Sequence, residues 1–88
     1  MKLVKGFVIK TVGGKCVAVA TGEASSRFKG MIVLNDTAKV IFNELMENDT
    51  TAEEIATKLT DIFDIDAEQA KTDAEAFISK LETLNIFC

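Results

Sequence analysis

The 88-residue sequence contains no histidine and no proline, and it has only two cysteines and three serines. Without histidine it lacks the commonest general base and the commonest metal ligand in proteins. No Ser-His-Asp or Cys-His arrangement can therefore be built. The paired glycines Gly13-Gly14 lack the GK[ST] ending of a phosphate-binding loop. We expect a protein that is not an enzyme and that uses no metal and no cofactor.

Other absences indicate the cellular compartment and the number of domains. Cys16 and Cys88 lie far apart and form neither a CxxC pair nor a metal-ligand cluster, so two free thiols in a reducing compartment are expected. No apolar run approaches the roughly 18 residues that span a bilayer, and the first residues lack the features of a signal peptide. With no proline-rich or low-complexity tract, the sequence predicts one domain over residues 1–88. We expect a cytoplasmic protein with no membrane partner.

The first third of the sequence predicts a small sheet. Residues 3–12 are rich in β-branched and aromatic side chains, Gly13-Gly14 suits a two-residue turn, and residues 15–20 predict the returning strand. Residues 21–29 follow no period, so we expect a loop that Phe28 pins to the core. Four apolar residues, Met31–Leu34, predict a third strand. Such a three-stranded antiparallel meander needs helices to cover one face.

Three helices are predicted after the sheet. Apolar residues at helical spacing and capping oxygens just before them indicate a helix over residues 36–47. A second helix begins at the capping box Thr51-Ala52-Glu53-Glu54. A third follows Asp66-Ala67-Glu68-Gln69 and runs to about residue 84. The expected fold is therefore α+β and winged helix-turn-helix-like, with a three-stranded antiparallel sheet followed by three helices.

Charge is divided unevenly along the chain. Residues 1–34 carry six basic side chains and only one acidic one, Glu23, a net charge of +5. Residues 35–88 carry four basic and thirteen acidic side chains, a net charge of −9. A basic sheet beside an acidic helical layer favours an acidic partner at the sheet. Two ordinarily solvated faces would give the same composition, so both interpretations stay open.

Winged-helix folds are often associated with DNA, and the third helix would be the one that enters a groove. This helix and its cap carry five acidic side chains against Lys71 and Lys80, a net charge of −3, which would repel phosphates. We therefore expect no nucleic-acid partner. An acidic winged-helix DNA-binding or regulatory protein is the alternative function. A structural protein that dimerises through its edge strand is a third hypothesis.

The order of several segments resembles the PqqD family, small peptide chaperones named after pyrroloquinoline quinone biosynthesis. These segments are Gly30–Ala38, Ile41–Leu45, Thr51–Ile55, Asp73–Leu81 and Leu84–Ile86. Each alone is only a strand or a capped amphipathic helix, but together they cover nearly the whole chain at the expected spacing. One departure is Asn85, which stands where the family commonly has a helix-ending glycine. Asparagine also tolerates the left-handed conformation.

The resemblance implies a recognition element that binds the leader of a ribosomally made precursor peptide. In that family the leader adds as a strand beside the third strand, packs against the third helix and is presented to a modifying enzyme, often a radical SAM enzyme. Carried to this sequence, the expected peptide-binding residues are Met31, Ile32, Val33, Leu34, Ala70, Lys71, Ala74, Phe77 and Ile78.

The residue pattern alone does not decide whether these residues form a binding site. A strand without internal charge or proline is available for pairing if it lies at an edge of the sheet. Met31–Leu34 could equally be an ordinary buried strand, and Ala70, Ala74 and Phe77 a plain core stripe, because the core needs such a stripe in any case.

Overall fold

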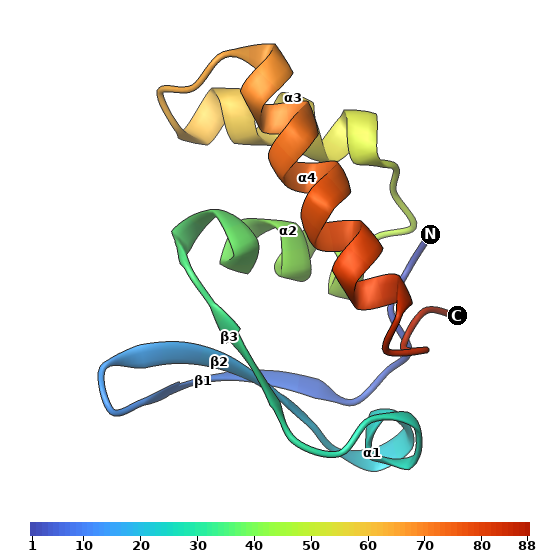
Figure 1. Ribbon diagram of the computed structural model, residues 1–88. Helices are drawn as coiled ribbons and strands as arrows, with labels where there is room; N and C mark the ends of the chain where they lie inside the picture. Colours follow the sequence, from blue (N-terminus) through green and yellow to red (C-terminus); the bar gives the residue numbers. More distant parts are fainter.

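The computed structural model describes residues 1–88 as a sheet, with the helices that follow its third strand stacked on one side of it (Figure 1). The three strands pair antiparallel in the order β1-β2-β3, as predicted. The elements in chain order are β1 (Phe7–Val12), β2 (Lys15–Ala20), α1 (Gly22–Arg27), β3 (Met31–Leu34), α2 (Asp36–Glu47), α3 (Ala52–Ile62) and α4 (Ala67–Glu82).

The sheet has one face toward the helices and one away from them. The register pairs Ile32 with Ala18 and Leu34 with Cys16, so these side chains share the inner face. Met31 and Val33 alternate with them and point outward. Because the alternation follows the strand period of two, burial in β3 also alternates. The predicted short third strand is confirmed.

The three predicted helix starts are confirmed, each by a side-chain cap. The Asn35 side chain accepts a hydrogen bond from the Ala38 amide at 2.8 Å, and Thr51 Oγ1 accepts one from the Glu54 amide at 3.2 Å. The Asp66 carboxylate accepts one from the Gln69 amide at 2.7 Å. Each cap satisfies a backbone donor that has no partner within its helix.

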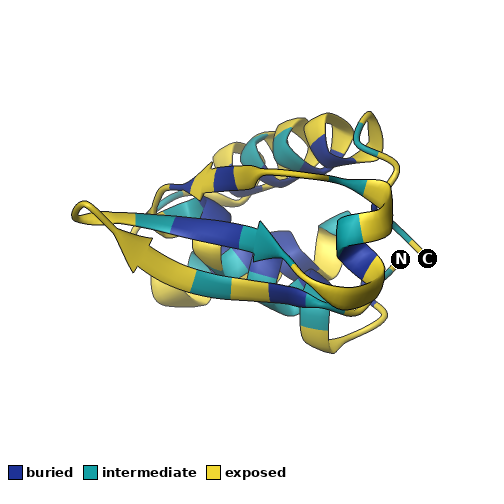
Figure 2. Cartoon of the chain, turned by 90° about the horizontal axis from the view of Figure 1, so that it is seen from below, coloured by how far each residue is buried: buried dark blue, intermediate teal, exposed yellow.

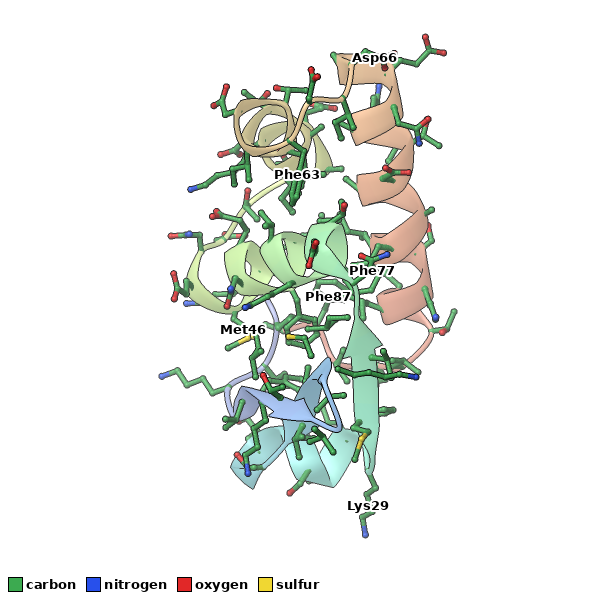
Figure 3. The ribbon with its side chains drawn as sticks, turned by 90° about the vertical axis from the view of Figure 1, so that its left-hand side faces the viewer. Lys29, Met46, Phe63, Asp66, Phe77 and Phe87 are labelled. Carbon is green, nitrogen blue, oxygen red and sulfur yellow. The ribbon has the colours of Figure 1, made fainter.

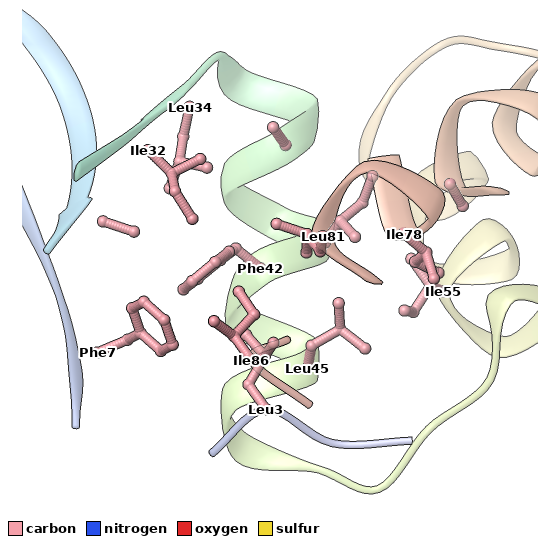
Figure 4. Close-up of a cluster of buried hydrophobic side chains, with 14 of the residues drawn as sticks. Leu3, Phe7, Ile32, Leu34, Phe42, Leu45, Ile55, Ile78, Leu81 and Ile86 are labelled. Atoms are coloured by element: carbon pink, nitrogen blue, oxygen red, sulfur yellow. The ribbon is translucent and has the colours of Figure 1, made fainter. Parts of the chain in front are cut away.

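The core lies between the sheet and the helices and is centred on α2 (Figure 4). Phe42 of α2 is completely buried and meets Phe7 of β1 edge to face, with ring centroids 5.2 Å apart. The inner side chains of β3 enter the same cluster. From α4 the core receives one buried stripe, made of Ala70, Ala74, Ile78 and Leu81. The small alanines let α4 pack closely against α3.

The first strand is shorter than predicted. It begins at Phe7, and the residues before it form a turn. Leu3 instead makes an isolated antiparallel bridge to Phe87, with the Val4 amide donating to the Ile86 carbonyl at 2.9 Å. Gly6, with φ +115°, separates the two segments. A composition rich in β-branched residues cannot reveal such a break, because both segments are extended.

Part of the predicted loop over residues 21–29 is the short helix α1. Ser25 and Ser26 donate hydroxyl hydrogen bonds to the carbonyls three residues before them, and Ala24 is fully buried. Six residues are too few for a helical period to be visible in the sequence. Phe28 follows α1 and packs against the core, as expected.

The C-terminal end of α4 is stabilised by a left-handed residue. The helix ends at Glu82, two residues earlier than predicted, and Asn85 has φ +57°. It is the only residue other than glycine with a positive φ. The prediction that Asn85 takes the helix-ending role of a glycine agrees with this conformation.

At the other end of the chain, the Met1 ammonium group donates a hydrogen bond to the Asp49 carboxylate. This contact lowers the pKa of the exposed Asp49 carboxyl.

Two kinds of feature are absent from residues 1–88. No helix has the length and apolar character needed to cross a membrane. No three side chains among histidine, cysteine, aspartate and glutamate gather where they could hold a metal ion.

Gly6 lies so close to the backbone of Thr21 that there is no space for a side chain. A Cβ atom there would lie 2.1 Å from the Thr21 carbonyl oxygen, and the backbone already has a positive φ. Gly6→Ala is expected to lower the free energy of unfolding by about 3 kcal/mol or more in urea titrations, from strain plus overlap. In Gly13→Ala, where no atom lies within 4 Å of the new Cβ, only the roughly 1–2 kcal/mol of left-handed strain applies. Equal losses would contradict this account.

The buried stripe of α4 generates a second prediction. Ala74 is fully buried, so Ala74→Glu would place a carboxylate in the apolar core and should lower the free energy of unfolding by about 3 kcal/mol or more. Ala76 is exposed two residues later, and Ala76→Glu should change stability by less than about 0.5 kcal/mol. Urea titrations followed by circular dichroism measure both. If Ala74→Glu is as stable as Ala76→Glu, α4 does not pack as described.

Candidate functional site

Strand β3 forms one edge of the sheet. It pairs with β2 on one side and with no strand on the other, so every second backbone N–H and C=O along that edge has no partner in the sheet. None of its four side chains is charged, and none is a proline. The other edge strand, β1, carries Lys10, a charge that hinders pairing with another strand. The unprotected edge is therefore that of β3.

An open groove lies next to the end of β3, between the start of α2 and the middle of α4. Its volume is about 320 Å³. Figure 3 shows β3 leading directly into α2, with α4 alongside and Phe77 where the two helices meet. The groove is lined by Asn35, Thr37, Ala38 and Ile41 on the side of α2, and by Asp73, Ala76, Phe77 and Lys80 on the side of α4.

The groove combines an apolar floor with polar groups at its margin. Ala38, Ile41, Ala76 and Phe77 provide the apolar surface. Asp73 already accepts a hydrogen bond from the Gln69 side chain at 2.7 Å. Lys80 makes no ion pair, so its ammonium group is free to meet an acidic group. This arrangement suits a ligand that brings an apolar side chain together with a polar or acidic group.

The structure separates the predicted peptide-binding residues of the strand into two sets. Met31 and Val33 point outward and are 54% and 61% exposed. Ile32 and Leu34 point into the core and are buried. Only the backbone edge of these four residues, together with the outward side chains, is accessible to a partner.

The five predicted residues of the helix do not share one surface. Phe77 is half-buried and lines the groove. Lys71 lies on the other flank of α4, in a depression of about 250 Å³ that α4 forms with α3. Ala70, Ala74 and Ile78 belong to the core, with exposed fractions of 5% or less. The predicted stripe is thus mainly the face that holds α4 to the protein.

Sequence reasoning missed most of the groove, including Asp73, Ala76 and Lys80 of α4. With Phe77 these residues form a second helical stripe, at spacings of three and four, beside the core stripe. A phenylalanine at the margin of the core stripe was a usable signal. Nothing in the sequence said which flank of α4 would face β3, because that depends on how α4 packs on α2 and α3.

Comparisons with known proteins agree with this fold. Residues 15–86 match the sequence model of the family described as Coenzyme PQQ synthesis protein D (PqqD). The solved structure of TbiB1 in complex with the TbiA(beta) leader peptide is similar, with a TM-score of 0.69 over 98% of this chain and 93% of that one, at 17% sequence identity. No curated protein sequence gives a significant match. The family match covers most of the sequence and includes β3 and all of α4, and the chain therefore belongs to the PqqD family.

Proposed function

We propose that this protein binds the leader segment of a ribosomally synthesised precursor peptide as an added strand along β3 and presents the peptide to a modifying enzyme. The observation that carries the proposal is the unpaired edge of β3 beside the apolar groove. Membership of the PqqD family supports it, as does the likeness to TbiB1, whose structure contains a leader peptide. The protein itself performs no chemistry in this proposal.

Strand addition accounts for both parts of the site. An extended peptide beside β3 would exchange main-chain hydrogen bonds with the free edge, and those bonds provide affinity with little dependence on sequence. Its side chains would alternate, one set toward the outer face near Met31 and Val33 and the other toward α4. Side chains of the second set would meet the groove at Phe77 and Ala76. Specificity for the leader is thus assigned to the groove.

The partner enzyme is expected to be a radical SAM enzyme or another maturation enzyme that modifies the core of the same peptide. A protein of this size can present such a peptide without a catalytic centre, because binding one segment brings the rest to the enzyme at high effective concentration. DNA binding is disfavoured by the acidic side chains of α4. Dimerisation through β3 would use the same edge and so would compete with the peptide.

The added strand predicts an alternating response to backbone methylation. Synthetic leader segments from small open reading frames beside the gene are first titrated against the protein by fluorescence anisotropy. The leader that binds is then made again with one backbone amide N-methylated at a time. Only every second amide faces β3, so only alternate positions should lose affinity. A net hydrogen bond contributes roughly 0.5–1.5 kcal/mol and the methyl adds a clash, so losses of about tenfold are expected. If all methylated leaders bind like the parent, the peptide does not pair with β3.

The groove predicts a matched pair of variants on α4. Ala76→Glu places a carboxylate on the apolar floor and should weaken leader binding by about tenfold without unfolding the protein. Ser79→Glu adds the same charge on an exposed position of the same helix that lines none of the described pockets, and it should bind normally. Equal affinities would remove the groove from the site. Steeply salt-dependent binding of duplex DNA, with none of any leader, would overturn the whole proposal.

A further inference from the structure

The outer face of the sheet is covered by no other element of the chain. Figure 2 views the molecule from this side and shows the strands in front of the helices. We call this surface the outer sheet face, and it is formed by Val8, Lys10, Val12, Lys15, Val17, Val19, Met31 and Val33. Four of the six large hydrophobic residues that the protein exposes lie on it: Val8, Val12, Met31 and Val33.

The register brings the apolar side chains of the outer sheet face next to one another across the three strands. Val8, Val19 and Met31 form one row across the three strands, and Lys10, Val17 and Val33 form the next. Val17, in the middle strand, is only 2% exposed. Antiparallel sheets that face water on one side commonly carry polar residues there. Here apolar side chains prevail on both faces, and contiguous exposed apolar surface marks sites of interaction.

The charges on the outer sheet face indicate what kind of surface it can bind. The only charged side chains on the outer sheet face are Lys10 and Lys15, and residues 1–34 contain six basic side chains but one acidic one. The complementary surface therefore has an apolar centre edged by carboxylates. A second copy in symmetric contact would bring together two faces that are both positively charged. The acidic helices of a second copy expose only one large apolar residue, Ile62, so they offer no matching centre.

We propose that the outer sheet face docks the modifying enzyme, through an apolar patch edged by acidic residues on that enzyme. This inference rests on the proposed function, because the face is continuous with the leader site through Met31 and Val33 of β3. A leader strand added to β3 would widen the outer sheet face by one strand. Every second leader side chain would then lie beside Met31 and Val33, and the enzyme would contact protein and leader together.

This geometry makes the two binding events cooperative. An enzyme that contacts the composite surface binds the leader-loaded protein more tightly than the free protein, and by linkage it tightens leader binding by the same factor. The lysines add an electrostatic contribution to association, so the association rate should fall as salt rises. The groove thus binds side chains of the leader, and the outer sheet face binds the enzyme.

The experiment uses strand β1, which lies farthest from the leader site. The probe is the purified maturation enzyme encoded beside the precursor peptide that binds in the titration above. Val8→Glu and Lys10→Glu alter the outer sheet face, and each should weaken enzyme binding by about tenfold or more while leader affinity stays within about twofold. Thr11→Glu makes the same charge change as Val8→Glu on the opposite side of β1, and Lys5→Glu matches Lys10→Glu outside the sheet. Both controls should bind the enzyme normally.

Each other outcome overturns the docking proposal. If Val8→Glu and Lys10→Glu bind the enzyme like the wild type, the enzyme docks elsewhere. If the wild-type protein sediments as a dimer that Val8→Glu dissociates, a second copy occupies the face. If the leader binds but the enzyme does not bind the wild-type protein, docking fails while the proposed leader function stands. If no leader binds in the titration without enzyme, the proposed function is wrong, and the docking proposal that rests on it is wrong as well.

Discussion

The direct passage from β3 into α2 fixes the arrangement of the rest of the protein. Leu34 ends the strand, Asn35 caps the helix, and Asp36 begins it, with no intervening loop. With so short a connection, α2 must cross the inner face of the sheet at once, and Phe42 reaches Phe7 beneath it. The helices that follow pack around α2. α4 therefore lies near the free edge of β3 while leaving the groove open.

The fold was predictable wherever a local signal decided the structure. The caps at Asn35, Thr51 and Asp66 and the helical spacing of apolar residues placed three helices, and α2 has the predicted bounds. The glycine turn and alternating strands placed the sheet. The sequence could not reveal α1, which is shorter than two helical turns. It also could not reveal the bridge between Leu3 and Phe87, because pairing between distant segments leaves no local pattern.

The candidate site was only partly predictable for the same reason. The free edge of β3 followed from an uncharged strand at the end of a meander, and Phe77 followed from the helix stripe. Ala70, Ala74 and Ile78 were expected at the peptide, but these residues hold α4 in the core. One periodic stripe cannot distinguish core from binding surface, since both require apolar residues at the same spacing. Asp73, Ala76 and Lys80 became visible as a surface only once α4 had been placed.

The pairing of the two ends of the chain also has a consequence for how the protein is made. Leu3 and Val4 are buried, and their backbone partners include Ile86 and Phe87. These backbone partners are distant in the sequence, so Leu3 and Val4 are synthesised long before the segment that pairs with them. Most of the helical layer can form earlier, but the core is complete only once Ile86 has been synthesised. Until then the nascent chain keeps an apolar segment exposed, and any contact with a chaperone or a partner during synthesis would occur in that interval.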